Sequence, residues 1–103
     1  MKTSFAIAVL FASTLLAGQT PPSDALTANS VFQNNCAKCH GKTAEGRFFA
    51  GPSLRSEKVG AASADDLRNI ITNGKSRMPK YGAKLSASEI DKLVEQIRTS
   101  AKK

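Results

Sequence analysis

The sequence has few cysteines and histidines, the residues that most often bind zinc: it contains two cysteines and one histidine among 103 residues. A structural zinc site usually takes four cysteine or histidine ligands, which these side chains cannot supply. The residues around the cysteines also lack a strand pattern, and this weighs against a thioredoxin-like redox pair, which lies in a βαβ unit. A plain disulfide in an exported protein is a further alternative, but it leaves the histidine unexplained.

The chain also lacks an apolar run long enough to cross a membrane. Its apolar stretch lies within residues 5–18, whereas a spanning helix needs ~20 apolar residues. Lys2 precedes this stretch and small residues end it, which is the pattern of a secretory signal peptide over residues 1–18. Gln19 stands where a lipoprotein would carry its lipid-bearing cysteine. We therefore expect an exported protein that starts near Gln19 and has no stable membrane anchor.

Acidic residues are scarce as well. The 15 lysines and arginines exceed the 8 aspartates and glutamates, so the formal net charge is +7, and loss of Lys2 with the signal peptide would lower it to +6. We expect a flexible tail over residues 19–25, which contains Pro21 and Pro22, and one small domain over residues 26–103. A domain of this size buries a thin core and commonly needs a covalent or metal staple.

Residues 36–40 read Cys-Ala-Lys-Cys-His, the spacing of a c-type haem attachment site. Two thiols at this separation can add to the two vinyl groups of one haem. The histidine that follows is then held where an imidazole nitrogen can ligate the iron. The motif predicts one covalently bound haem c on Cys36 and Cys39, with His40 as an iron ligand, and this haem would staple the small core.

The remaining pattern predicts an all-α fold. A first helix is expected from residue 24 or 27 to residue 39, a loop over residues 46–60, and a second helix over residues 63–73. A last helix follows the capping box formed by Ser86 and Glu89. The apolar positions of these helices are Val31, Phe32, Leu67, Ile70, Ile71, Ile90, Leu93, Val94 and Ile97.

The mature chain resembles the class I cytochromes c, in particular the small single-haem bacterial and photosynthetic kinds. The resemblance covers residues 24–101 and rests on three ordered motifs: Phe-Gln-Asn-Asn-Cys-Ala-Lys-Cys-His-Gly at 32–41, Gly-Pro-Ser-Leu at 51–54, and Met-Pro-Lys-Tyr to Leu-Ser at 78–86. It implies a small cytochrome c fold in which three to four helices wrap around one covalently bound haem.

The resemblance also implies roles for single residues. Cys36 and Cys39 would hold the haem, with His40 as the proximal ligand of the iron and Met78 as the distal one. Pro52 matches the family proline whose carbonyl accepts a hydrogen bond from the ligating histidine and so fixes the ring.

Two positions depart from the family pattern. Ala28 stands where the first helix usually has a glycine at its crossing with the last helix, and Gln96 stands where the last helix usually has an aromatic residue. Loss of an aromatic ring removes buried area. We therefore expect this crossing to be looser, or to be repacked by Phe32 and Leu93.

Met78 is the only methionine that remains once residues 1–18 are removed, and it lies in a loop rich in glycine and lysine. Packing in a core gap is the alternative role for it. Thioether–imidazole ligation favours ferrous iron and leaves no open position for a substrate, which indicates an electron carrier and not an enzyme. Two alternatives remain open: a haem enzyme or gas sensor in which Met78 dissociates, and an electron-accepting subunit of a periplasmic dehydrogenase.

Basic residues flank both predicted ligand segments. Such a rim would steer an acidic redox partner, for example a reductase, an oxidase or a dehydrogenase, although a merely solvated face is the alternative. We expect a monomer that binds no nucleic acid and works in the periplasm, or alternatively in a thylakoid lumen. The residues of the rim are Lys38, Lys42, Lys75, Arg77, Lys80 and Lys84.

Overall fold

The computed structural model describes residues 24–101, so the predicted signal peptide and residues 19–23 of the predicted tail lie outside the described residues. Within residues 24–101 there is no β-strand, only two isolated bridges, Arg47 with Gly51 and Lys75 with Met78. The prediction of an all-α fold is confirmed. The helical segments are α1 (Ala25–Ala28), α2 (Ser30–Asn35), α3 (Ala37–His40), α4 (Glu57–Ala61), α5 (Ala64–Asn73) and α6 (Ala87–Ala101).

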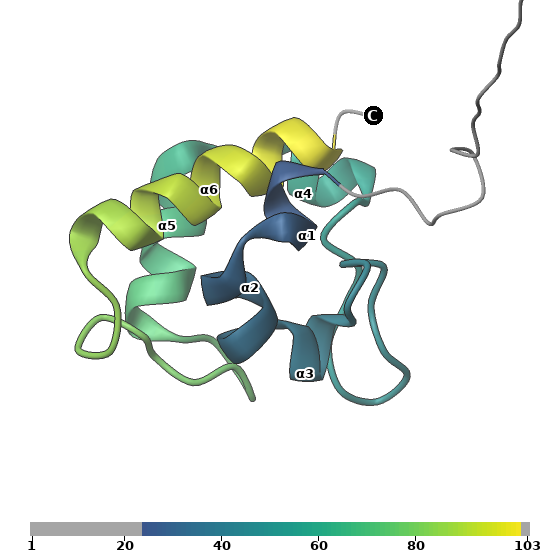
Figure 1. Ribbon diagram of the computed structural model, residues 1–103, viewed down its shortest axis with the longest axis horizontal. Coiled ribbons are helices and arrows are strands. Elements are labelled where there is room, and N and C mark those ends of the chain that lie inside the picture. Colours follow the sequence, from purple (N-terminus) through teal and green to yellow (C-terminus); the bar gives the residue numbers. More distant parts are fainter. Residues whose placement is uncertain (1–23, 102–103) are drawn as a thin grey trace, which may run out of the picture.

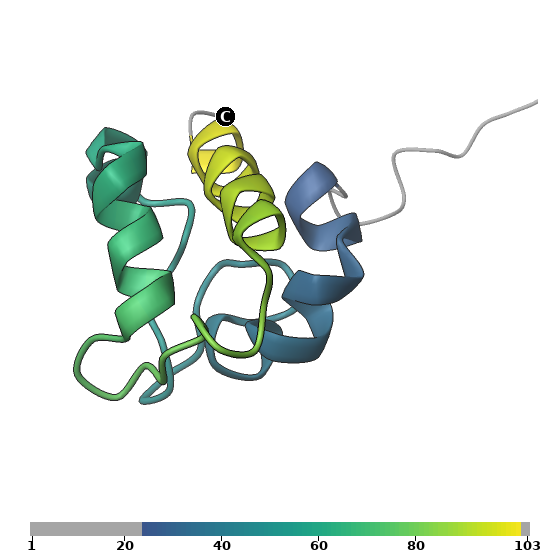
Figure 2. The same cartoon turned by 90° about the vertical axis from the view of Figure 1, so that its left-hand side faces the viewer.

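Helix α6 is the centre of the fold, because it packs against α1, α4 and α5. Figure 2 shows it between α5 on one side and α1 on the other. It begins at the predicted capping box: the Ser86 amide donates to Glu89 Oε1 at 2.8 Å, and the Glu89 amide donates to Ser86 Oγ at 3.1 Å. Its predicted apolar face is buried and consists of Ile90, Leu93, Val94 and Ile97.

The prediction of one continuous first helix was wrong. Asn29 has an extended backbone, with ψ 119°, and separates α1 from α2. Its side chain accepts a hydrogen bond from the Val31 amide at 2.8 Å and donates one to Gln96 Oε1 of α6 at 2.9 Å. Asparagine side chains that bond to nearby backbone amides compete with the backbone hydrogen bonds of a helix. The second partner of Asn29, Gln96, lies far away in the sequence, so a local pattern does not reveal it. A second interruption lies at Cys36, between α2 and α3.

Large apolar side chains of the first segments and of α6 are buried in one hydrophobic core. Ala28 is exposed, so it is not the point of close approach that the family pattern assigns to it. Leu26, Phe32 and Leu93 are at most 1% exposed. Phe32 and Leu93 are both buried in the hydrophobic core, and Gln96 accepts a hydrogen bond from Asn29 where the family has an aromatic ring.

The loop expected over residues 46–60 contains a helix that the sequence analysis missed. Helix α4 begins after Ser56, whose hydroxyl oxygen accepts a hydrogen bond from the Val59 amide at 3.3 Å. It has five residues and a single large apolar side chain, so it shows no helical periodicity and is held by its packing on α6. Helix α5 follows as predicted, capped by Ser63 and ended by Gly74. Figure 1 shows α4 and α5 behind α6.

Candidate haem-binding site

The Cys-Ala-Lys-Cys-His segment forms one compact turn. Cys36 caps α3, and its carbonyl oxygen accepts hydrogen bonds from the amides of Cys39 at 3.1 Å and His40 at 2.9 Å. Both cysteines are free thiols and half-buried, whereas His40 is buried. Burial, with a smaller effect from Cys39, raises the pKa of the Cys36 thiol to about 11. At neutral pH this thiol is therefore uncharged, which suits the edge of an apolar core.

The ring of His40 is fixed by the backbone of Pro52. His40 Nδ1 lies 2.8 Å from the Pro52 carbonyl oxygen. A carbonyl oxygen only accepts hydrogen bonds, so Nδ1 carries the proton and donates it. Nε2 then keeps its lone pair, and this is the nitrogen that can bind a metal.

Gly51 brings the Pro52 segment against α3. A Cβ atom at Gly51 would lie 2.8 Å from the carbonyl oxygen of Cys39 and 3.3 Å from Cys39 Cβ. No real Cβ makes contacts this short with backbone, so the position requires glycine. This close approach places the Pro52 carbonyl within hydrogen-bond distance of His40.

Met78 lies on a separate loop between α5 and α6. Its amide donates to the Lys75 carbonyl at 2.8 Å, and its carbonyl accepts from the Lys75 amide at 3.2 Å. Gly74 opens this turn with φ 79°, and a Cβ there would lie 2.7 Å from the Met78 carbonyl oxygen. The Met78 side chain is half-buried and packs against the edge of the hydrophobic core, as Cys36 does.

Tyr81 joins the Met78 loop to the cysteine segment, a role that the sequence analysis did not assign. Its amide donates to the Ile71 carbonyl at 2.9 Å, and its buried hydroxyl donates to the carbonyl of Asn35, the residue before Cys36, at 2.8 Å. Burial, followed by the negative charge that Cys36 and Cys39 can carry, raises the pKa of Tyr81. The only tyrosine of the chain, three residues after Met78, was the available signal.

A partly buried ionic cluster that the sequence analysis also missed holds the loop after Pro52. Arg55 donates through Nε to the Thr43 carbonyl at 2.8 Å and through a terminal nitrogen to Asp24 Oδ2 at 2.9 Å. The Ser100 hydroxyl donates to the same Asp24 oxygen at 2.8 Å. Burial opposes ionisation of Asp24, but the hydrogen bonds from Arg55 and Ser100 lower the pKa of this carboxyl well below its usual range. No local sequence motif predicts a cluster whose members lie so far apart in the sequence.

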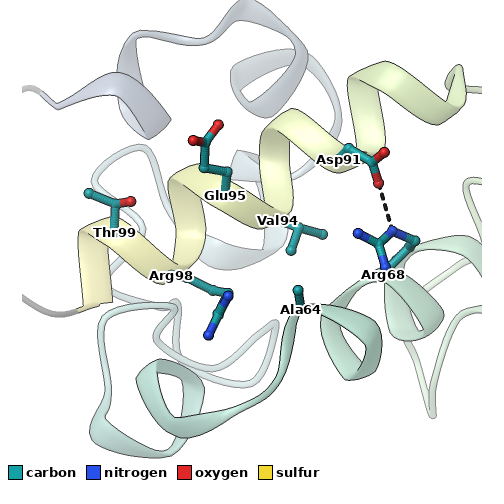
Figure 3. A pocket seen from close by; sticks show the side chains of 7 residues that line it. All are labelled: Ala64, Arg68, Asp91, Val94, Glu95, Arg98 and Thr99. Carbon is teal, nitrogen blue, oxygen red and sulfur yellow. Dashed lines mark hydrogen bonds and ion pairs between the residues drawn. The ribbon is translucent and has the colours of Figure 1, made fainter.

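The donor set in this part of the molecule fits a covalently bound haem. It offers two free thiols, an imidazole with a free Nε2, and one thioether. Within residues 24–101 no group of three or more histidine, cysteine, aspartate or glutamate side chains is placed to hold a metal ion by itself. A hollow of about 310 Å³ lies between α5 and α6 (Figure 3), and none of the predicted haem-contact residues lines it. Its lining residues are Ala64, Arg68, Asp91, Val94, Glu95, Arg98 and Thr99.

Comparison with known proteins places this chain in one family. The family model described as cytochrome c oxidase, cbb3-type, subunit III, matches residues 23–97. The chain belongs to the cytochrome c family, as a class I cytochrome with a single haem. Members of this class carry one covalently bound haem c with its iron, and they are electron carriers and not enzymes.

Among its relatives are cytochromes c6. The chain is 32% identical to cytochrome c6 of Rippkaea orientalis over 105 residues, which cover 94% of this chain and 88% of the relative. It is 33% identical to cytochrome c6 of Microcystis aeruginosa over 79 residues, covering 72% and 94%. The solved structure of cytochrome c6 from the diatom Phaeodactylum tricornutum superposes with a TM-score of 0.62 at 25% identity, over 78% of this chain and 97% of that one. The c-type cytochrome NirC gives the same TM-score and identity, over 75% and 94%.

Proposed function

We propose that this cytochrome is an exported carrier that passes single electrons between redox partner proteins, with the haem on Cys36 and Cys39 and the iron ligated by His40 and Met78. The observation that carries the proposal is the 2.8 Å contact between His40 Nδ1 and the Pro52 carbonyl. It selects the tautomer that leaves Nε2 free, and it holds the ring rigidly next to the two cysteines.

Met78 is proposed as the distal ligand because its backbone is fixed at both ends of the loop. Gly74 and the bond between Lys75 and Met78 hold it on one side, and Tyr81 holds it on the other. A bound haem supplies a one-electron couple, and a thioether ligand raises its reduction potential. If His40 and Met78 both held the iron, no position would remain open for a substrate. This favours an electron carrier over an enzyme or a gas sensor.

The partner is proposed to be acidic. Residues 36–51 and 74–85 contain seven basic residues and one acidic residue, Glu45, and all eight are exposed. Tyr81 in the second segment donates to the carbonyl of Asn35, the residue before the first segment, and Arg77 donates to the Phe49 carbonyl, so the two basic segments adjoin each other. A positive field next to the redox centre raises the rate of encounter with a negatively charged partner.

Export rests on the pattern of residues 1–18. No helix within residues 24–101 is long and apolar enough to cross a membrane. We propose that the mature chain is monomeric, begins near Gln19, and works in the periplasm or, alternatively, in a thylakoid lumen. Mass spectrometry of the purified protein tests this, and an intact chain recovered from the membrane fraction would contradict it.

The visible spectrum of the purified protein tests the proposed function most directly. Ferric protein with a bound methionine shows a weak charge-transfer band in the far red, and voltammetry should give a reversible one-electron wave. A spectrum without this band, together with rapid binding of carbon monoxide by the reduced protein, would point instead to a haem enzyme or gas sensor. Purification in a stoichiometric complex would point to a dehydrogenase subunit.

A further inference from the structure

Two neighbouring phenylalanines are displayed on the surface. Phe48 is 88% exposed and Phe49 is 83% exposed, and they are the exposed large hydrophobic residues of the described chain. Their ring centroids lie 4.1 Å apart at an interplanar angle of 44°, so the rings contact each other and form one apolar knob. Two large aromatic rings kept side by side in water are an unfavourable surface unless something covers them.

The knob sits on a closed turn. The Arg47 amide donates to the Gly51 carbonyl at 2.9 Å, and the Gly51 amide donates back to Arg47 at 3.2 Å. At the tip, Phe49 has φ 64°, a left-handed conformation that bulky residues rarely adopt. The turn therefore presents both rings outward in a fixed arrangement, at the expense of a strained backbone, and strain of this kind gathers at functional sites.

The turn lies between the two segments that carry the proposed haem contacts. Gly51 packs directly on the backbone of Cys39. On the other side, an Arg77 terminal nitrogen donates to the Phe49 carbonyl at 3.5 Å, and Arg77 is the residue before Met78. Exposed cations lie on both segments, where the acid is Glu45, and Arg47 and Arg77 are the ones that adjoin the two phenylalanines along the chain or by a hydrogen bond. The exposed cations of the two segments are Lys38, Lys42, Arg47, Lys75, Arg77, Lys80 and Lys84.

We propose that Phe48 and Phe49 are the apolar anchor through which this carrier docks a redox partner, a protein whose apolar depression is ringed by carboxylates. The inference rests on the proposed function and adds the residues that make the contact. Aromatic and arginine side chains dominate the binding energy of protein interfaces, whereas peripheral charges mainly set the rate of encounter. Arg47 and Arg77 beside the two rings match this composition.

A lipid membrane is the other kind of partner that binds a surface of aromatic and basic side chains. Stable binding to it usually needs a longer apolar face, such as an amphipathic helix, or an acyl chain. Here the exposed apolar surface is limited to two rings on one tight turn, and it adjoins Cys39. A protein partner needs its contact at this position, because electrons enter and leave through the haem that Cys39 would hold.

The test uses the purified holoprotein and two electrode surfaces as probes: one monolayer of mixed carboxyl and methyl groups, and one of mixed carboxyl and hydroxyl groups. Surface plasmon resonance gives the adsorption constant, and voltammetry gives the potential. Wild type should adsorb roughly tenfold more tightly on the methyl surface, the scale of a modest hot spot. The variant Phe48→Ser/Phe49→Asn should lose this preference and keep the same midpoint potential. Asparagine tolerates the left-handed region, so the turn is retained.

The variant Phe48→Tyr/Phe49→Tyr is the matched control, because it keeps both rings and should retain most of the preference. Equal adsorption of wild type and the Ser/Asn variant on the methyl surface would overturn the docking proposal. Binding of wild type alone to vesicles of phosphatidylglycerol and phosphatidylcholine, tighter than to the methyl surface, would overturn it in favour of a membrane. Loss of the reversible wave in wild type would instead refute the proposed function, while the adsorption comparison could still be read.

Discussion

The Tyr81 hydroxyl donates a hydrogen bond of 2.8 Å to the carbonyl oxygen of Asn35, across 46 residues of sequence. Asn35 immediately precedes Cys36, and Tyr81 follows Met78 by three residues. This phenol group therefore ties the loop with the proposed distal ligand to the segment with the proposed haem attachment.

Replacement of Tyr81 by phenylalanine should leave the packing in place and remove this bond. The half-buried Asn35 carbonyl then loses its bond to the phenol, so the free energy of unfolding should fall by about 1–2 kcal/mol in chemical denaturation. The far-red band of the ferric protein should weaken, because the Met78 loop is less constrained. An unchanged band and unchanged stability would show that the bond does not hold the loop.

The same tyrosine should limit stability at high pH. Burial raises the pKa of Tyr81 above its ordinary value of about 10, so the folded state resists its ionisation. Its contribution is therefore complete below about pH 10 and is lost as the pH rises through the folded pKa. Thermal melts from pH 8 to pH 11 should show a steeper loss in wild type than in Tyr81→Phe. Parallel curves would exclude the tyrosine as the titrating group.

Replacement of Met78 by alanine should open the sixth position of the iron to water, carbon monoxide or a nearby lysine. The reduction potential should fall, because the ferrous state loses its thioether ligand, and peroxidase-like activity should rise. The fold should survive, since both cysteines and His40 remain. Leu85→Ala on the same loop is the control and should keep the far-red band. If Met78 only packs, the spectrum and potential of Met78→Ala will equal those of wild type.

Single replacement of Cys36 or Cys39 by serine should leave one thioether and greatly reduce the yield of holoprotein. The double variant should lose haem that resists denaturation, because no thiol remains to bond to it. Haem staining of a denaturing gel measures this. Full staining in the double variant would contradict the assigned attachment.

The cluster of Asp24, Arg55 and Ser100 should give an acid-dependent contribution to stability. The pKa of Asp24 is lowered in the folded state, so its contribution is present above about pH 4, the unfolded pKa, and is lost as the pH falls further. Asp24→Ala should cost about 2–3 kcal/mol at pH 7, somewhat below a fully buried pair because Arg55 keeps some contact with water. The deficit should shrink toward pH 2. Asp66→Ala, at an exposed acid, should cost under about 1 kcal/mol, and an equal loss in both variants would contradict a special role for Asp24.

Charge on the Met78 side should govern encounter with an acidic surface. On a carboxylate-terminated electrode, the electron-transfer rate should fall as salt rises, since the Debye length shrinks to ~8 Å at physiological ionic strength. Lys80→Glu should slow the transfer more than Lys92→Glu on the exposed face of α6. If the two substitutions slow the transfer equally, the charge near Met78 has no special role in encounter, and the positive charge serves only general solubility.

Features with local causes were predicted well from the sequence. Apolar periodicity located α5 and α6, together with the Ser63 cap of α5 and the capping box of Ser86 and Glu89, because these signals lie within a few residues of each other. The spacing of Cys36, Cys39 and His40 is itself the chemical signal for haem, so no tertiary information was needed to propose the attachment site.

Features that depend on distant residues were not predicted. Asn29 interrupts the first helix with the help of Gln96 on α6, and a helical pattern cannot reveal such a partner. The short α4 is stabilised by packing and not by its own periodicity. Arg55 finds Asp24 and Ser100 only in the folded chain. Aromatic residues are expected in the core, so the sequence did not predict that Phe48 and Phe49 are exposed. Their exposure results from the turn closed by Arg47 and Gly51.

The contact between Asp24 and Ser100 brings the two ends of the described domain together, at 2.8 Å between the carboxylate and hydroxyl oxygens. Both views place the start of α1 and the end of α6 on one side of the molecule, away from α3 and the loop between α5 and α6 (Figures 1 and 2). A partner domain or surface tether fused at either end would therefore be attached on the side of the molecule opposite α3 and the loop between α5 and α6. A protein engineer could tether this electron carrier at that side and leave the cysteine segment and the methionine loop on the opposite side.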